Sequence, residues 1–202
     1  MQILCLDMEG VLTPEVWINV AERTGIEALR ATTRDVPDYD VLMRQRLGIL
    51  DEHGLGIAEI QEVIGTLDLL PGARDFLDRM RERYQVVILS DTFYDFATPF
   101  VVKMNYPTLF CHRLEIDERG RIANYHLRMA DQKRHAVEAF RGLNFKVVAA
   151  GDSYNDTTML SAAHAGILFR PPQNVIDEFP QFPVTTDYDS FEAEVHRAFA
   201  AQ

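Results

Sequence analysis

Two carboxylates follow the first apolar run of the chain at a spacing suited to binding a cation. Asp7 and Glu9 come directly after residues 3–6, and Gly10 stands next. Carboxylates this close repel one another unless a cation or a shared proton offsets their charge. Mg²⁺ prefers such hard oxygen ligands, so the motif predicts a magnesium site. A turn that carries two solvated acids would explain the motif equally well.

Two later apolar runs also end in polar residues. The segment 151–156 (Gly-Asp-Ser-Tyr-Asn-Asp) follows the run 147–150 and opens a predicted helix, so that Asp152 and Asp156 add two carboxylates. Asp and Asn at such a place can also serve only as cap and turn residues. Ser90 and Asp91 follow the run 86–89, where a hydroxyl and backbone N–H groups at a helix start would form an anion cradle or a plain helix cap.

One lysine stands where a cation is locally unfavourable. Lys133 falls in the first turn of a predicted helix that begins near Asp131. A positive charge there opposes the helix dipole, which indicates a functional role. The alternative is an ordinary solvated lysine.

The elements that must position these residues follow from the apolar runs. Residues 3–6, 86–89, 147–150 and 167–169 are short runs without alternation, which is typical of buried parallel strands. Apolar residues recur at helical spacing from Ala73 to Tyr84. Strands that alternate with helices predict an α/β fold with a doubly wound parallel sheet. Ligands bind outside the carboxyl ends of such strands, the edge that would hold Asp7, Ser90 and Asp152.

The first strand is not followed by a compact crossover. Residues 14–70 have helical patterns throughout, and this stretch is too long for an ordinary loop. We therefore predict a helical cap inserted at residues 14–70 into an α/β core formed by residues 1–13 and 71–202. A turn at 118–120 between short alternating runs predicts a hairpin within residues 113–129.

The composition excludes several classes of partner. The chain of 202 residues has a formal net charge of −11, which argues against nucleic acid, whose phosphate backbone requires a cationic surface. No run approaches the ~18 apolar residues of a membrane span, and the N-terminus does not resemble a signal peptide. These features predict a cytoplasmic protein without a membrane partner. The oligomeric state is left open, with a homodimer as one option.

Taken together, the strand-end motifs resemble those of the haloacid-dehalogenase-like superfamily of aspartyl-nucleophile phosphatases. The resemblance spans nearly the whole chain, and residues 14–70 correspond to the cap domain of that superfamily. It implies that Asp7 is the nucleophile and that Glu9 is the general acid and base. Glu9 replaces the usual Asp, so its carboxylate lies one methylene further from the backbone.

The same resemblance implies the remaining roles. Mg²⁺ would bind Asp7, Asp152 and the backbone carbonyl of Glu9, while Asp156 would orient the metal shell and Lys133. The groups that would hold the phosphoryl oxygens are Ser90, the backbone N–H of Asp91, and Lys133.

A cation on an apolar helix face points to the substrate. The helix predicted to start near Asp38 places Arg46 at the centre of its apolar stripe. Arg46 could form a salt bridge with a neighbouring acid, or it could grip a substrate carboxylate. Glu15 occupies the N2 position of a predicted Thr-Pro-Glu helix start, which suits Glu on dipole grounds alone, but it could also meet a substrate ammonium. A phosphorylated amino acid would satisfy both groups.

Glu15 and Arg46 correspond to the substrate-binding Glu and Arg of phosphoserine phosphatases, although Glu15 is one residue closer to Asp7 than is usual. The chain is most similar to a bifunctional branch that hydrolyses phosphoserine and passes its phosphoryl group to homoserine. The resemblance also assigns Asn155 to substrate binding. Three alternatives remain: a phosphatase of another small ester, a receiver-like phospho-acceptor signalling domain, and a decayed non-catalytic relative.

Overall fold

A seven-stranded sheet forms the centre of the computed structural model, which describes residues 1–32, 35–36 and 38–201. Its strands lie in the order β4-β3-β2-β1-β5-β6-β7, and every neighbouring pair is parallel except β3 and β4. The strand bounds are β1 (Gln2–Leu6), β2 (Gln85–Phe93), β3 (Thr108–Ile116), β4 (Ile122–His126), β5 (Lys146–Gly151), β6 (Ala165–Phe169) and β7 (Val184–Thr185). The predicted parallel α/β sheet is confirmed.

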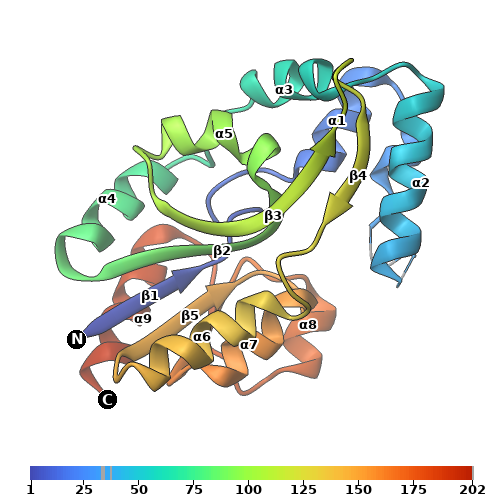
Figure 1. Cartoon of the computed structure of the whole chain (residues 1–202). Helices are drawn as coiled ribbons and strands as arrows, with labels where there is room; N and C mark the ends of the chain where they lie inside the picture. Colours follow the sequence, from blue (N-terminus) through green and yellow to red (C-terminus); the bar gives the residue numbers. More distant parts are fainter. Residues whose placement is uncertain (33–34, 37, 202) are drawn as a thin grey trace.

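Helices cover both faces of the sheet because the central strands are apolar on both sides. In β1, Leu4 and Leu6 pack into one buried cluster, whereas Ile3 and Cys5 pack into the other. The first cluster includes residues of α4 (Ala73–Arg83), α5 (Tyr94–Lys103) and α9 (Tyr188–Ala200). The second includes residues of α6 (Gln132–Gly142), α7 (Thr157–Ala162) and α8 (Gln173–Glu178). Figure 1 shows both termini at the end of the molecule opposite to α1 and α2.

The second strand is longer than its apolar run. It continues to Phe93, which pairs with His112 of β3 after a register irregularity that begins at Leu89. Ser90 and Asp91 therefore lie within β2, and α5 begins only at Tyr94. The predicted helix start at Ser90 is wrong, because this polar segment is extended and lies between the two parts of β2 that pair with β3.

The predicted hairpin is confirmed, and one of its strands also joins the main sheet. Its strands β3 and β4 are antiparallel, and Gly120 in the turn has a φ of 80°. The first part of β3 also pairs in parallel with β2, which extends the main sheet. This pairing was not predicted, since the polar and alternating residues of β3 do not resemble a buried strand.

The segment after the first strand is helical where the structure describes it. It contains α1 (Val16–Thr24), the 3₁₀ helix η1 (Glu27–Arg30), α2 (Tyr39–Glu52) and α3 (Ile57–Gly65). The predicted start of α2 is confirmed, because Asp38 caps it by accepting a hydrogen bond from the Val41 N–H. Buried side chains of these helices belong to the same cluster as β1 and α4. A separate cap domain therefore stays a prediction.

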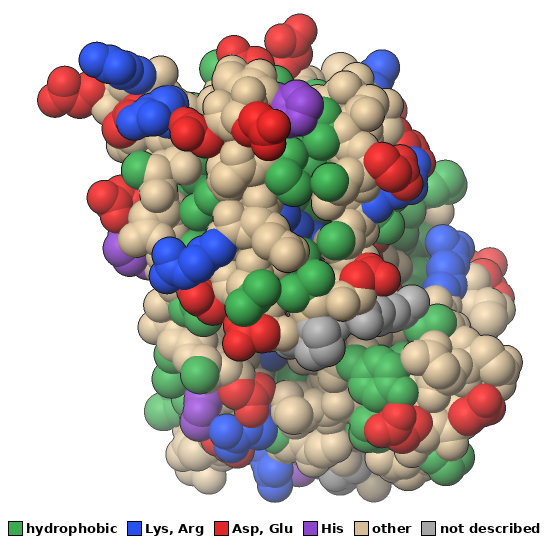
Figure 2. Space-filling view, turned by 90° about the vertical axis from the view of Figure 1, so that its right-hand side faces the viewer, with side chains coloured by type: hydrophobic (Ala, Val, Ile, Leu, Met, Phe, Trp, Pro, Cys, Tyr) green, Lys and Arg blue, Asp and Glu red, His purple; other side chains and the backbone are tan. Residues whose placement is uncertain are grey.

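The surface mixes charges of both signs. In Figure 2, Lys and Arg side chains on the visible face are interspersed with Asp and Glu side chains. Within the described residues, no helix is both long enough and apolar enough to cross a membrane.

Candidate active site

The loop after β1 is folded tightly against the loop after β5. The N–H groups of Leu12 and Thr13 both donate to the carbonyl of Met8, which closes a sharp turn. Gly10 in this turn has a φ of 77°, and an added Cβ would lie 2.5 Å from Cγ of Asp152. Only glycine fits both the backbone conformation and this close approach. Because Gly10 closely follows Asp7, the end of β1 can lie against the end of β5.

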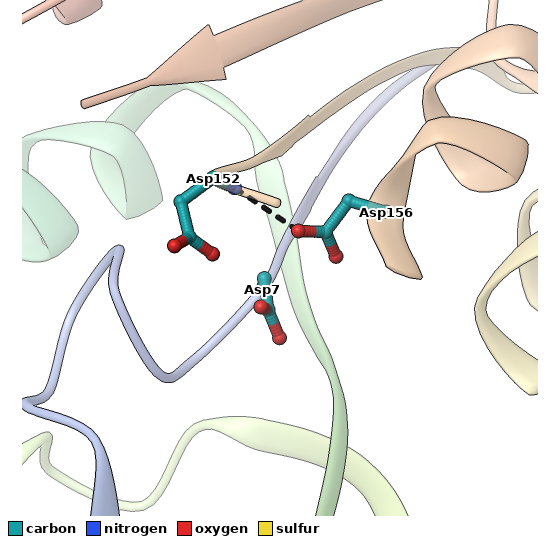
Figure 3. Close-up of side chains that lie close together, drawn as sticks. All are labelled: Asp7, Asp152 and Asp156. Atoms are coloured by element: carbon teal, nitrogen blue, oxygen red, sulfur yellow. Dashed lines mark hydrogen bonds between the residues drawn. The ribbon is translucent and has the colours of Figure 1, made fainter. Parts of the chain in front are cut away.

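Three carboxylates converge where these loops meet. Asp7, Asp152 and Asp156 each offer an oxygen within 4.8 Å of the others. Figure 3 shows Asp7 after β1 facing the two aspartates that follow β5. Asp156 accepts the N–H groups of Asp152 at 3.0 Å and Ser153 at 3.1 Å, so it fixes the loop. A Cβ on Gly151 would lie 2.2 Å from Asp156 Cγ, which explains the glycine there.

The acidic cluster is short of positive charge. Burial, followed by repulsion from Asp156, raises the pKa of Asp7 well above its usual range, with Lys133 opposing the shift. Burial, followed by repulsion from Asp156 and Glu15, raises the pKa of Asp152 to about 7. Hard oxygen donors that repel one another in a buried site fit a divalent cation. The site can therefore hold a metal through Asp7 and Asp152.

Lys133 is a buried member of the site. It is 2% exposed and its Nζ lies 2.9 Å from Asp7, 2.8 Å from Asp156 and 3.3 Å from Asp91. Burial acts to lower the pKa of Lys133, but attraction to these three carboxylates outweighs it and raises the pKa well above the usual value. The alternative of a solvated lysine is wrong. α6 begins at Gln132, as predicted, and its first turn directs this cation inward.

The Ser90–Asp91 segment is held by side chains from three other elements. The Asp91 carboxylate accepts hydrogen bonds from Asn155 at 2.9 Å and from Gln132 at 3.2 Å, and His112 Nε2 lies 3.6 Å away. Burial alone would raise the pKa of Asp91, but Lys133 and these hydrogen-bond donors hold it well below its usual range. The prediction assigned a role only to the backbone N–H of Asp91. Its side chain is the centre of a network.

Sequence reasoning missed two buried members of that network. Gln132 is 1% exposed, donates to the carbonyl of Ser90 and accepts from Arg128 Nη2 at 2.7 Å. His112 is 4% exposed, and its Nδ1 accepts the Arg128 N–H at 3.0 Å. No local pattern marks either residue as part of the site, because the Ser90–Asp91 segment that they contact is distant in sequence. The only available signal is that Gln132 precedes Lys133 on the same helical turn.

Glu9 contacts the first turn of α1. Its Oε2 accepts the Val16 N–H at 2.9 Å, so its side chain satisfies an amide at the helix start. Burial, followed by repulsion from Glu15, raises the pKa of Glu9 to about 8. Glu9 is therefore suited to carry a proton near neutral pH.

Glu15 does not occupy the predicted N2 position. The helix begins at Val16, and Glu15 is the N-cap residue without a side-chain capping bond. The prediction of Thr13, Pro14 and Glu15 as N-cap, N1 and N2 is wrong, because Glu9 supplies the acceptor from outside the helix. Glu15 is exposed at the cleft, where it remains a candidate ligand for an ammonium group.

Arg46 is buried and forms no salt bridge within the described residues, although Glu9 and Glu15 lie close enough to attract its charge. It is 7% exposed, and among the described residues no carboxylate lies within salt-bridge distance of it. Its Nη2 donates to the Ala31 carbonyl at 2.8 Å, and its guanidinium carbon lies 4.5 Å from the centre of the Trp17 ring. Its Nε has no hydrogen-bond partner. Burial lowers the pKa of Arg46 to about 10. The salt-bridge alternative is wrong.

One cleft of about 730 Å³ contains nearly all of the predicted site residues. Asp156 lies behind it, bonded to Lys133 and to the Asp152 loop. Apolar side chains, among them Trp17, Leu42 and Met129, form part of the wall. The predicted residues that line the cleft are Asp7, Glu9, Glu15, Arg46, Ser90, Asp91, Lys133, Asp152 and Asn155.

Comparisons with known proteins agree with this arrangement. A family model described as haloacid dehalogenase-like hydrolase matches residues 1–164. The chain is 62% identical over 198 residues to phosphoserine phosphatase ThrH of Pseudomonas aeruginosa, which covers 98% of this chain and 97% of that protein. It is 61% identical over 197 residues to a phosphoserine phosphatase of Pseudomonas syringae pv. tomato, which covers 98% of this chain and 83% of that protein.

A solved structure described as a phospho-aspartyl intermediate analogue of phosphoserine phosphatase has a TM-score of 0.78 to this chain. The two chains are 17% identical, and the match covers 96% of this chain and 98% of that one, which supports the fold alone. Because the family model spans most of the chain and the Pseudomonas aeruginosa protein matches nearly its full length, this chain belongs to the haloacid dehalogenase-like hydrolase family, in the branch of phosphoserine phosphatase ThrH.

Proposed function

We propose that this chain is a Mg²⁺-dependent phosphatase and phosphotransferase that uses L-phosphoserine as donor and water or homoserine as acceptor. The environment of Arg46 is the observation that supports this choice of substrate. It is a buried cation with an unpartnered Nε, in the wall of the cleft that also holds Asp7. A buried guanidinium without a carboxylate is costly, and a substrate carboxylate would supply the missing acceptor.

The converging carboxylates would hold Mg²⁺. Asp7 and Asp152 would provide carboxylate oxygens, and Glu9 its backbone carbonyl. Asp156 is engaged by two backbone N–H groups and Lys133, which favours an orienting role over direct binding. When bound, the ion supplies positive charge for the phosphoryl oxygens.

The reaction proceeds in two displacements at phosphorus. A carboxylate oxygen of Asp7 attacks in line and forms an acyl phosphate as the ester P–O bond breaks. Glu9 gives its proton to the departing serine oxygen. The ionised Glu9 then takes a proton from water or from the hydroxyl of homoserine as that oxygen attacks phosphorus, and Asp7 is released.

The remaining groups position the donor. Ser90, the backbone N–H of Asp91, and Lys133 hold the phosphoryl oxygens, since phosphoryl transfer depends mainly on positioning and charge. Arg46 binds the carboxylate of the amino acid, and Glu15 binds its ammonium group. Asn155 donates to Asp91 and faces the cleft, where it can also contact the substrate. Homoserine is serine with one extra methylene, so the same clamp can seat donor and acceptor in turn.

Two of the alternatives lose support. A receiver-like module needs neither Glu9 nor the helices that form the cleft, and membership of a hydrolase family favours turnover. The decayed relative would not need Lys133 and three carboxylates in contact. A different small phosphate ester remains the competing substrate.

The test is phosphate release from L-phosphoserine with Mg²⁺, with and without homoserine, and with phosphohomoserine assayed in the same samples. We expect turnover that stops with chelator and yields phosphohomoserine when homoserine is present. In Arg46→Ala, we expect KM for L-phosphoserine to rise roughly 10- to 100-fold. An unchanged KM would refute the carboxylate clamp. Free phosphate without phosphohomoserine would leave a phosphatase alone.

Two further properties remain predictions. A homodimer is one possible assembly, and light scattering after gel filtration would decide it. Cytoplasmic location would be tested by fractionating cells that express the full chain.

A further inference from the structure

We infer that Trp17 is a specificity-determining residue, which positions the guanidinium of Arg46 in the wall of the cleft. This inference rests on the proposed role of Arg46 as the carboxylate ligand. Trp17 would act on the discrimination between substrates with and without a carboxylate and would leave the chemistry at Asp7 unchanged.

The Trp17 indole contacts the Arg46 guanidinium. The guanidinium carbon is 4.5 Å from the centre of the Trp17 ring, within the range of a cation–π contact. Trp provides the strongest such contact among aromatic residues, and the contact is worth most when the cation is desolvated. Arg46 is desolvated, since burial lowers its pKa to about 10.

The hydrogen bonds of Arg46 do not by themselves fix its orientation. Its Nη2 has a strong acceptor, the Ala31 carbonyl at 2.8 Å. Its Nη1 has only the Met43 sulfur at 3.8 Å, which is a weak acceptor. Nε has none. One good hydrogen bond and one weak one constrain the guanidinium only partly, so the contact with the Trp17 ring adds a further constraint on its position.

Trp17 is itself held by a helix that packs on the sheet. Its ring packs edge-to-face against Phe96 of α5, with centroids 5.4 Å apart and an interplanar angle of 74°. Phe96 is 1% exposed in the main apolar cluster. Arg46 of α2 is therefore held in a fixed position relative to the core that carries Asp7. Without this contact, the guanidinium would be placed by α2 and by its hydrogen bond to the Ala31 carbonyl.

The same helical turn also holds Glu9. Val16, the residue before Trp17, donates its N–H to the Glu9 carboxylate at 2.9 Å. The first turn of α1 therefore joins the proposed proton donor to the proposed carboxylate ligand, and both Trp17 and Glu9 line the cleft. Substitution of the Trp17 indole should disturb Arg46. It should leave the hydrogen bond to Glu9 in place, because the Val16 backbone donates that bond.

The test compares two substrates that differ in one group. O-Phosphoethanolamine has the phosphate and ammonium of L-phosphoserine but lacks the carboxylate. For Trp17→Leu we expect kcat/KM for L-phosphoserine to fall roughly 10- to 30-fold, mainly through KM, with little change for O-phosphoethanolamine. Trp17→Phe keeps an aromatic face and should restore most of the loss. An equal loss on both substrates would overturn the inference.

A double-mutant cycle tests whether Trp17 acts through Arg46. In an Arg46→Ala background, Trp17→Leu should cause no further loss of discrimination. The same loss in both backgrounds would show an independent role and refute the inference. Phe199→Leu is the control for loss of a buried aromatic ring, because Phe199 stacks on Tyr84 and does not line the cleft. It should leave the substrate ratio unchanged.

The outcomes separate this inference from the proposed function. If the wild-type enzyme shows no preference for L-phosphoserine and Arg46→Ala has no effect, the carboxylate clamp itself fails. If the wild-type preference exists and Arg46→Ala removes it, but Trp17→Leu retains it, only the role of Trp17 fails. NMR gives a readout without turnover: the Arg46 Nε–H resonance should move in Trp17→Leu and stay near its wild-type position in Phe199→Leu.

Discussion

Single carboxylates in this protein differ in role because their surroundings differ. Asp7 is buried beside Lys133, and Glu9 accepts a hydrogen bond from the backbone at the start of α1. Asp91 accepts hydrogen bonds from two side-chain amides. The pKa of Glu9 is raised to about 8, while that of Asp91 is held well below its usual range. One acid is thus kept protonated near neutral pH and another ionised, which is how one cleft can supply both a proton donor and fixed negative charge.

Asp7→Asn should abolish turnover without loss of the fold. An amide oxygen is a poor nucleophile, so we expect activity to fall by roughly 10⁴-fold or more. Because burial and then repulsion from Asp156 raise the pKa of Asp7 despite the opposing effect of Lys133, removing its charge should leave the melting temperature unchanged or higher. Phosphate release and thermal unfolding measure the two effects. Asp68→Asn, at a side chain that is 90% exposed, is the control. Retained activity in Asp7→Asn would refute the mechanism.

Glu9→Asp should change the ratio of hydrolysis to transfer. The shorter side chain cannot keep the Val16 bond and also reach into the cleft, so α1 should lose a capping interaction worth about 1 kcal/mol. We expect water to compete better with homoserine, because the acid no longer fills the same space. The two products and urea unfolding provide the measurement.

Glu59→Asp is the matched control for Glu9→Asp. Glu59 accepts the Gly56 N–H at 2.8 Å at the start of α3, so it also caps a helix but does not line the cleft. It should reduce stability by a similar amount and leave the product ratio unchanged. An unchanged ratio in Glu9→Asp would count against a role for the longer side chain.

The loops at the carboxyl ends of β1 and β5 approach each other so closely that two positions have no room for a side chain. Gly10 and Gly151 stand where a Cβ would meet Asp152 and Asp156, respectively. The strand ends were predictable, because the carboxyl ends of parallel strands share one edge. The start of α5 was not, since β2 continues through Ser90 and Asp91 and pairs with β3 again at Phe93. Local sequence does not encode that partner.

Gly10→Ala should weaken metal binding. The added methyl group would displace the Asp152 carboxylate, whose Cγ would lie 2.5 Å away. Gly25→Ala is a matched control, because Gly25 has a φ of 70° but nothing within 4 Å of an added Cβ. Both variants should lose about 1 kcal/mol of stability from backbone strain. Only Gly10→Ala should raise the Mg²⁺ concentration needed for half-maximal activity; equal Mg²⁺ dependence in both variants would contradict this.

The whole molecule carries mutual repulsion that a cation would relieve. Its formal charge is −11, and three carboxylates meet at the carboxyl edge of the central strands. Lys133 contacts Asp7, Asp156 and Asp91, so one positive charge is shared among several negative ones. The apolar core on both faces of the sheet must hold this edge together until a ligand binds.

Mg²⁺ should therefore stabilise the folded protein. At roughly 100 times the dissociation constant, a ligand that binds only the native state adds about 2.7 kcal/mol, which corresponds to a rise of about 5–10 °C in melting temperature for a domain of this size. Differential scanning fluorimetry with Mg²⁺ and then with chelator measures the shift and its reversal. Asp152→Asn should abolish most of it. A shift of the same size in Asp152→Asn would place the metal elsewhere.

The strand ends that carry Asp7 and Asp152, and the helix that carries Arg46, were predictable from the sequence. They follow from short apolar runs and helical spacing, which are local patterns. The tertiary structure was needed to show that Lys133 points inward, that Arg46 lies on Trp17, that Glu9 holds the start of α1, and that Gln132 and His112 support the Ser90–Asp91 segment. Most of these contacts join elements that are distant in sequence, and the Glu9 bond needs the tight turn after β1. They form only once the chain has folded, so no local pattern records them.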